Sequence, residues 1–566
     1  MINPKKVLVY GVIAITVVII IVTMYTALFR SSSDNSLAIK SGIQPITNSN
    51  NPSIEQFRNQ FCGLNSNVNS NNYVTEYKLP HDCEMPLGIA VDNQAGKVWY
   101  VSTKQGVLGD YNLITKKFDK EISIPVWNVR EYPMDFSNVW FVKVKGNSIW
   151  FTDEKQNTIW RYSKAFGFDM YKIPEKSPAF GTISPVSLDF DSKGNVYFVG
   201  IHSPVLWFGN VTQMKNNTSD GIRKIPMPVG SFKDIDPKQI STGSLAVDNK
   251  RNVIWISLSA FASEGEILRY NITSRTFDTF VLPEQLSLPV GLAVDNNGDL
   301  WATDHGTSIF YTLDTKSHNI TMFATSNASP KIYGLNESSS LPEDAYTLPY
   351  WIEKGADDGS IWFNEHQGNK IARFDPVSNT LYEYWIPTQN RLWGDCPPSS
   401  KTCGIANVLQ FSNGENGQMW FTELSENKIG SIAPSTYYNN STTSAYFNNN
   451  HNGSHQLPFS VSVSHPELTI KRGQSVEIKV NISSGTSLRS DINMVSSGTF
   501  TPTGGLGNST GSFSEQSFSL KPMHTKEVSF IFTPSTDLGS GEYTLMLGAQ
   551  NDAIAIMKAV NVHILD

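Results

Sequence analysis

The chain has 566 residues and a net charge of −7, with 17% charged, 39% hydrophobic and 11% aromatic residues. This length exceeds one ordinary domain, and few charges with many aromatic residues favour an all-β protein with half-buried strands. Lys and Arg form no large cluster. A nucleic-acid partner is therefore excluded, because phosphate binding needs a basic surface.

The N-terminus predicts a membrane anchor. Lys5 and Lys6 precede an apolar run over 7–29, which reaches about 34 Å as a helix and is long enough to cross a hydrocarbon core. A cleaved signal peptide is the alternative, although such peptides have a shorter apolar region and a small-residue cleavage site. The lysines hold residues 1–6 in the cytoplasm. We therefore expect a single-pass protein of the cell membrane with the bulk of the chain outside the cytoplasm.

Residues 30–72 are rich in Ser and Asn and predict a spacer from the membrane. Twelve Asn-x-Ser/Thr sequons agree with an exported glycoprotein. The four cysteines form two local sets, Cys62 with Cys83 and Cys396 with Cys403. Neither set has metal-ligand spacing or a His pair, so we expect two disulfides.

An internal repeat fills residues 73–434. Its phrase is a small apolar strand, a turn with Gly or Asn, and a strand that begins with Trp or Tyr. The seven copies lie at 86–102, 139–154, 184–200, 243–257, 288–305, 348–366 and 404–423. Third and fourth strands follow most copies, and four short strands in each unit predict a seven-bladed β-propeller. We expect the Trp or Tyr of each copy to pack between neighbouring blades.

The seventh copy lacks a fourth strand, and the segment YVTEYKLP at 73–80 resembles the fourth strands elsewhere. We therefore expect the N-terminal strand to complete the last blade, pairing near Lys428 to Ile432. Such a closure also removes an open edge strand.

The C-terminal part predicts a second domain. Residues 435–456 form an Asn- and Ser-rich linker. Over 457–566 alternating strands are separated by Gly, Ser and Pro turns, which favours an immunoglobulin-like β-sandwich. The phrase around Tyr543 resembles a tyrosine corner.

The copies WFNEHQGNKIARFDP at 362–376 and WFTELSENKIGSIAP at 420–434 resemble the repeat of the streptogramin lyases, the virginiamycin B lyases. Propellers of the NHL and gluconolactonase kinds share a looser version of the phrase. The resemblance implies a seven-bladed fold and a magnesium-dependent elimination that opens a cyclic depsipeptide. That family's catalytic His follows the Pro that opens an inner strand. Here the corresponding positions hold other residues, namely Leu87, Val186, Val290 and Tyr350.

Residues just after the second strands of a propeller converge on one mouth of the channel. Here they include Asp153, Glu154, His202, Asp304, His305, Glu365, His366 and Glu423. The carboxylates of Asp304, Glu365 and Glu423 are candidate ligands for Mg²⁺ or Ca²⁺, which prefer oxygen. His366 and Tyr350 are the candidate catalytic residues, because His titrates near neutral pH and Tyr350 stands at the family's base position. The alternative is that the acids only cap hairpins and bind the adjacent Asn-Lys turn.

The sequence leaves two functions open. One is a surface module that binds a small molecule, peptide or glycan at the propeller mouth, with or without a divalent metal. The other is a metal-dependent carbon–oxygen lyase that opens a cyclic ester. The absence of His at the four family positions favours the binding module.

Overall fold

The computed structural model describes residues 62–63, 70–103, 105–119, 121–127, 138–260, 263–335, 339–342, 345–393, 403–433, 457–485 and 490–566. Within these residues the regular structure is β, apart from short 3-10 helices: η2 Gly230–Asp234, η3 Pro237–Gln239, η4 Pro330–Tyr333, η5 Glu415–Gly417 and η6 Leu424–Glu426. No helix of this part is long and apolar enough to cross a membrane. The predicted anchor, residues 7–29, lies outside the described residues, as do most of the spacer and all of the linker.

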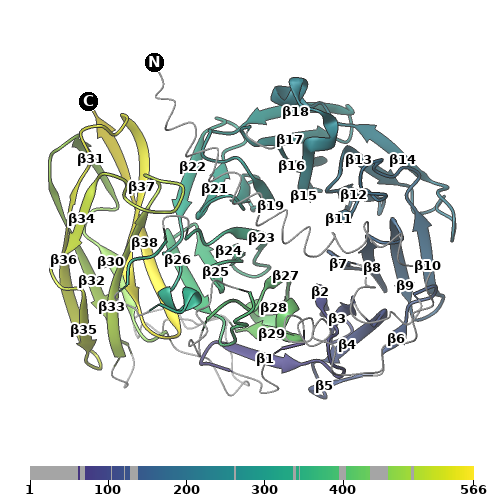
Figure 1. Ribbon diagram of the computed structural model, residues 1–566, viewed down its shortest axis with the longest axis horizontal. Helices are drawn as coiled ribbons and strands as arrows, with labels where there is room; N and C mark the ends of the chain where they lie inside the picture. Colours follow the sequence, from purple (N-terminus) through teal and green to yellow (C-terminus); the bar gives the residue numbers. More distant parts are fainter. Residues whose placement is uncertain are drawn as a thin grey trace, which may run out of the picture.

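Seven antiparallel sheets follow one another round a ring as the blades of a propeller (Figure 1). Blades one to three contain β2 Pro86–Asp92, β3 Lys97–Ser102, β4 Val107–Asn112, β5 Lys117–Phe118 and β6 Ile122–Ser123; β7 Val142–Lys145, β8 Ser148–Asp153, β9 Thr158–Ser163 and β10 Gly167–Lys172; and β11 Pro185–Phe190, β12 Val196–Gly200, β13 Ser203–Gly209 and β14 Ile222–Pro226.

Blades four to seven continue the ring in the same order. They contain β15 Ile240–Asp248, β16 Val253–Ala260, β17 Glu266–Asn271 and β18 Thr276–Val281; β19 Pro289–Val294, β20 Leu300–Asp304, β21 Ile309–Leu313 and β22 Ile320–Ala324; β23 Pro349–Lys354, β24 Ile361–Glu365, β25 Lys370–Asp375 and β26 Thr380–Trp385; and β27 Val408–Asn413, β28 Met419–Glu423, β29 Lys428–Ile432 and β1 Val74–Lys78. The count of seven predicted from the repeat is confirmed.

The turn between the first and second strands of blade five shows how the repeat folds locally. Asp295 Oδ1 accepts hydrogen bonds from the backbone N–H groups of Asn297, Gly298 and Asp299 at 2.8–2.9 Å. Gly298 has a φ of +98°, which a residue with a side chain rarely adopts. The Asp and the Gly of the repeated turn therefore both serve the reversal of the chain.

The aromatic residue that opens each second strand lies in the core, between 1% and 8% exposed in all seven blades. Trp301 of blade five packs on Phe374 of blade six with ring centroids 5.4 Å apart. Trp420 of blade seven packs on Tyr111 of blade one at 5.6 Å. The predicted packing between neighbouring blades is confirmed.

The N-terminal strand closes the ring as predicted. β1 pairs antiparallel with β29, with Val74 opposite Ile432 and Lys78 opposite Lys428. The Cys62–Cys83 disulfide is present beside this strand. Cys403 is also disulfide-bonded. Cys396, its predicted partner, lies outside the described residues.

The C-terminal domain consists of two facing sheets (Figure 1). One contains β30 Ser460–Val463, β32 Val476–Ser483, β36 Thr525–Thr533 and β34 Thr510–Phe513; the other contains β31 Glu467–Lys471, β38 Ile554–Leu565, β37 Gly541–Gln550, β33 Ser490–Gly498 and β35 Ser517–Leu520. The second sheet continues into the propeller, because β38 pairs antiparallel with β26, the outer strand of blade six. The sequence did not predict this shared nine-stranded sheet.

Candidate functional site

The three carboxylates predicted as metal ligands occupy equivalent places in neighbouring blades. Asp304 ends β20, Glu365 ends β24 and Glu423 ends β28. All three are 0% exposed. All three carboxylates are thus buried, and their surroundings differ: Asp304 accepts backbone hydrogen bonds and Glu365 lies beside a lysine, whereas both Glu423 oxygens have no hydrogen-bond partner among the described residues.

Asp304 caps the entrance to its blade. Its Oδ2 accepts the backbone N–H of Leu288 at 2.8 Å, and its Oδ1 accepts that of Gly306 at 3.0 Å. Burial raises the pKa of Asp304 to about 6, while these hydrogen bonds oppose the rise. For this residue the structure agrees with the alternative interpretation, hairpin capping.

Glu365 belongs to a buried ion cluster of blade six. Lys370 Nζ lies 2.8 Å from Glu365 Oε2 and 3.1 Å from Glu383 Oε1, and all three side chains are fully buried. Burial and the nearby Glu383 raise the pKa of Glu365 well above its usual range, and Lys370 opposes the rise. One lysine thus serves two carboxyl groups, which favours the protonated form of Glu365.

Glu423 belongs to the corresponding cluster of blade seven. Burial and the charge of Glu76 raise the pKa of Glu423 well above its usual range, against the effect of Lys428. Glu365 and Glu423 are thus held in two separate clusters. In the part of the chain that the structure describes, no group of three His, Cys, Asp or Glu residues could hold a metal ion. Asp304, Glu365 and Glu423 do not form such a group, and a Mg²⁺ or Ca²⁺ site at these acids stays a prediction.

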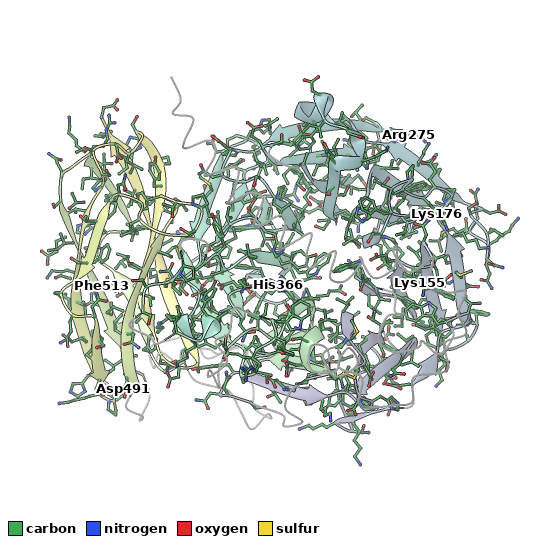
Figure 2. All side chains as sticks on the ribbon, viewed as in Figure 1. Lys155, Lys176, Arg275, His366, Asp491 and Phe513 are labelled. Atoms are coloured by element: carbon green, nitrogen blue, oxygen red, sulfur yellow. A yellow bond between two sulfur atoms is a disulfide. The ribbon has the colours of Figure 1, made fainter. Side chains whose placement is uncertain are left out.

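The residue after each acid leaves the strand, and this brings two histidines together. The backbone N–H of His305 donates to Leu288 at 2.8 Å, and that of His366 donates to Leu348 at 3.0 Å. The two imidazole rings stack with centroids 5.5 Å apart and planes 14° apart. Figure 2 shows His366 on the inner side of blade six, toward the middle of the ring.

Tyr350, from the first strand of blade six, completes this cluster. Its ring centroid lies 4.4 Å from that of His305 and 6.0 Å from that of His366. The predicted catalytic residues Tyr350 and His366 are therefore neighbours, and His305, also expected at the mouth, lies with them. We call His305, Tyr350 and His366 the mouth cluster.

The mouth cluster is uncharged at neutral pH. The pKa of His305 is lowered to about 3 by burial and by the neighbouring His366. The carbonyls of Pro349 and Leu348 oppose this shift. Burial also lowers the pKa of His366 and raises that of Tyr350. His305 Nδ1 is buried and has no hydrogen-bond partner of standard geometry among the described residues.

Asn407 fixes the orientation of His366. The Oδ1 atom of Asn407 lies 2.8 Å from His366 Nε2. When Nε2 carries the proton it donates to this oxygen, and Nδ1 keeps its lone pair as an acceptor. Asn407 stands before the first strand of blade seven with a φ of +54°. The sequence analysis missed this residue, although Asn tolerates that conformation better than most residues.

A ring of hydrogen bonds between blades places Tyr350, and sequence reasoning missed it too. Thr303 of blade five donates through Oγ1 to the carbonyl of Tyr350. Asn364 of blade six donates to the carbonyl of Val408 at 2.7 Å, and Thr422 of blade seven donates to that of Leu87 at 2.9 Å. The signal was the small polar residue just before each acid of the repeat.

Other residues expected at the mouth have separate partners. Trp127 and Trp160 both donate from their indole N–H groups to Asp153 Oδ2, at 2.6 and 3.1 Å. Glu154 accepts from Trp140 at 2.8 Å, and burial raises its pKa. His202 stacks on Phe180 with centroids 3.8 Å apart. None of these contacts connects to the mouth cluster among the described residues.

The two long insertions, 324–347 and 388–407, contact each other. The backbone N–H of Gly404 in the second donates to the carbonyl of Ile332 in the first at 2.8 Å. The second insertion supplies Asn407 to the mouth cluster, and the first is followed by Leu348, whose carbonyl accepts the His366 amide. The two insertions therefore lie together beside the mouth cluster.

Comparisons with known proteins point to the fold alone. No protein-family model matches the chain, and no curated protein matches it. Among solved structures, the chain is similar to a streptogramin B lyase and to the virginiamycin B lyase of Staphylococcus aureus, each with a TM-score of 0.47 and 21% identity over 64% of this chain and 99% of the other. It is also similar to a luciferin-regenerating enzyme, with a TM-score of 0.31 and 12% identity over 62% of this chain and 92% of the other.

Proposed function

We propose that this protein binds an uncharged, carbonyl-bearing ligand at the propeller mouth, through His305, Tyr350 and His366. The observation that carries the proposal is the packing of these three rings within 4.4 to 6.0 Å of one another. A small molecule, a peptide or a glycan would each present the carbonyl, hydroxyl or amide groups that such rings recognise.

The electrostatics of the cluster support an uncharged ligand. With the pKa values of both histidines lowered and that of Tyr350 raised, all three groups are neutral near pH 7. A neutral imidazole offers one donor and one acceptor, and a phenol offers both as well. The ring faces supply apolar contact area beside these polar atoms. A charged ligand would find no counter-ion within the cluster.

The second candidate function is a lyase that opens a cyclic ester. It is favoured by one observation, that Tyr350 lies beside His366 at the position where the resembling family carries its base. With its pKa raised, Tyr350 stays protonated at neutral pH, so it is a poor base and is present there as a neutral hydrogen-bond donor. Magnesium dependence stays a prediction of this alternative. Of the carboxylates named for the metal, Glu365 lies beside Lys370 and Glu423 lies near Lys428.

The cellular setting of the proposal rests on the sequence. We propose that residues 7–29 anchor the chain in the cell membrane and that the propeller faces the exterior, with N-linked glycans on its surface. Asn216 and Asn508 are exposed, as acceptor residues must be.

For the C-terminal domain we propose an immunoglobulin-like sandwich. Tyr543 Oη donates to the carbonyl of Gly539 at 3.1 Å, four residues upstream. This is the type of hydrogen bond that a tyrosine corner makes in such domains.

The experiment that separates the two functions uses the full chain in detergent with a streptogramin B depsipeptide as probe. Equilibrium dialysis measures binding, and liquid chromatography with mass spectrometry measures turnover, with Mg²⁺ and with EDTA. The binding module predicts a bound, chemically unchanged probe in both conditions. Elimination would break the ester C–O bond without adding water, so the lyase predicts a product of altered retention time and unchanged mass that EDTA suppresses. Neither binding nor turnover of this probe would contradict the mouth as a site for cyclic depsipeptides.

A further inference from the structure

A groove of about 700 Å³ lies where blade five meets the C-terminal domain, away from the propeller mouth. One wall is Asn319 to Met322 in and beside β22, and the other comes from β31, β37 and β38. Figure 1 shows β22 beside β37, and the two strands are in contact. This volume is within the range of ligand sites in proteins, about 300–1,000 Å³.

The first wall is the outer edge of a sheet. β22 is the last strand of blade five and pairs only with β21 within the described residues. Thr325 N–H donates to Ser308 and Asp314 N–H to Asn319, so the odd-numbered residues of this strand bond inward. Antiparallel pairing alternates, and Ile320 and Met322 therefore direct their backbone N–H and C=O groups outward. Ala324 confirms this direction, because its carbonyl accepts from Ser497 of the C-terminal domain at 3.2 Å.

The second wall presents two polar rows on one face of the sheet. Asn561 lies opposite both Glu467 and Thr544, and His563 lies opposite both Thr469 and Glu542. Residues directly opposite each other in a sheet share a face. Glu467 and Glu542 are exposed, and the residues that line the groove, as described, include no Lys or Arg. His563 Nδ1 lies 2.6 Å from Glu542 Oε1, and the other carboxylate oxygen of Glu542 is left for a cation. The groove is therefore acidic.

The same chain shows that an outer blade edge takes up a further strand. On blade six, β38 pairs with β26 in antiparallel register from Thr380 opposite Lys558 to Tyr384 opposite Ile554. On blade two, the backbone of residues 217 and 218 bonds to β10 through Met170 and Lys172. The outward groups of Ile320 and Met322 form no such bond to any residue that the structure describes.

We propose that this groove binds a basic, extended peptide segment of another protein, which adds as a strand to β22. The backbone groups of Ile320 and Met322 hold the peptide main chain, and Glu467 and Glu542 bind its Lys or Arg side chains. Strand addition gives affinity through main-chain hydrogen bonds, and the flanking side chains select the sequence. The site is independent of the function proposed for the mouth.

The test uses fluorescence anisotropy with the full chain in detergent. The wild type is tested beside Asn319→Gln, which removes the Asn-Ile-Thr sequon at the groove, and we expect the two to bind the probe equally. The further variants are made in the Asn319→Gln protein. The probe is a fluorescein-labelled hexapeptide of alternating Lys and Val. Two control peptides replace Lys by Glu, or carry N-methyl groups on alternate amides so that they cannot pair as a strand. We expect saturable binding of the probe and of neither control peptide.

Two protein variants locate the binding. Met322→Pro removes one outward N–H from an edge strand, where Pro is tolerated, and should weaken binding about fivefold, since one hydrogen bond is lost. Glu467→Gln with Glu542→Gln keeps the shape and should also weaken binding about fivefold, with a smaller salt dependence.

Equal binding of the N-methylated peptide would overturn strand addition even if Met322→Pro fails to fold. Binding of chito-oligosaccharides in place of the peptide would overturn the proposal as well.

Discussion

Glu76 Oε2 lies 2.7 Å from Lys428 Nζ, and this buried ion pair joins residues 352 positions apart in the chain. Glu76 stands opposite Gly430 in the sheet of blade seven. In blade six, Glu383 stands opposite Ala372 and pairs with Lys370 at 3.1 Å. Glu76 of β1 therefore has the same register and the same kind of lysine partner in blade seven as Glu383 of β26 has in blade six.

The first prediction concerns this closure. Glu76→Ala should lower the free energy of unfolding by about 3 kcal/mol, because it leaves Lys428 buried without that partner. It also removes the two hydrogen bonds that Thr388 donates to Glu76. Urea unfolding followed by tryptophan fluorescence measures the change. The matched control is Glu527→Ala, which breaks the exposed Lys479–Glu527 pair and should cost at most about 1 kcal/mol. Equal effects of the two substitutions would contradict the importance of the closing pair.

The second prediction concerns the shared sheet. A protease site placed within residues 435–456 should allow cleavage of the chain without release of the C-terminal domain. Backbone pairing of β38 with β26 holds the two parts together, as does the Trp385 indole N–H, which donates to Asn551. Size-exclusion chromatography after cleavage measures this, with a urea-treated sample as control. Separate elution of the fragments without denaturant would show that the junction does not hold.

The third prediction follows from the lowered pKa of His305. In the folded protein this ring takes up its proton near pH 3, whereas in the unfolded chain it does so near pH 6.5. Between these values the unfolded state binds the extra proton, so stability falls as the pH drops from about 6.5 toward 3. His305→Gln should reduce the slope by about 1.4 kcal/mol per pH unit in this window. Urea midpoints of the variant and the wild type at pH 4, 5 and 6 measure the difference.

Asp304 acts in the opposite direction and must be kept in place for this comparison. Its pKa is raised to about 6, so the folded state holds a proton that the unfolded state has lost, and stability falls as the pH rises through that range. Because both proteins retain Asp304, its effect is shared by variant and wild type. Identical slopes in the two proteins would contradict the lowered pKa of His305.

The fold was predictable because its signals are periodic and local. The Trp or Tyr after each turn repeats seven times, and the missing last strand pointed directly to residues 73–80. The junction of β38 with β26 was not predictable. An edge strand that accepts a partner shows the same alternation of apolar and polar residues as an edge strand that stays unpaired. The approach of the two domains depends on main-chain groups, which the sequence does not distinguish.

The site was predictable in part. Position after the second strand selected His366, and the family's base position selected Tyr350. The structure places the two side by side, and their function stays a proposal. The acids of the same phrase were expected to converge, and the structure instead buries Glu365 and Glu423 beside lysines of their own blades. The Asn-Lys pair that follows Glu365 and Glu423 in the sequence was the signal for these lysine partners. Asn407 was missed because it enters from the next blade, 41 residues beyond His366.

The central claim is that the mouth cluster binds the ligand, and the most direct test is to measure binding after this cluster is altered. The full chain in detergent is titrated with the streptogramin B depsipeptide by calorimetry, as the wild type, as Tyr350→Phe with His366→Ala, and as His465→Ala. The last replaces an exposed histidine of the C-terminal domain and serves as the control. Loss of a hydrogen bond and an aromatic contact at the mouth should weaken binding at least about tenfold in the double variant, with the control unchanged. Unchanged binding by a folded double variant would contradict the assignment of the site to the mouth cluster.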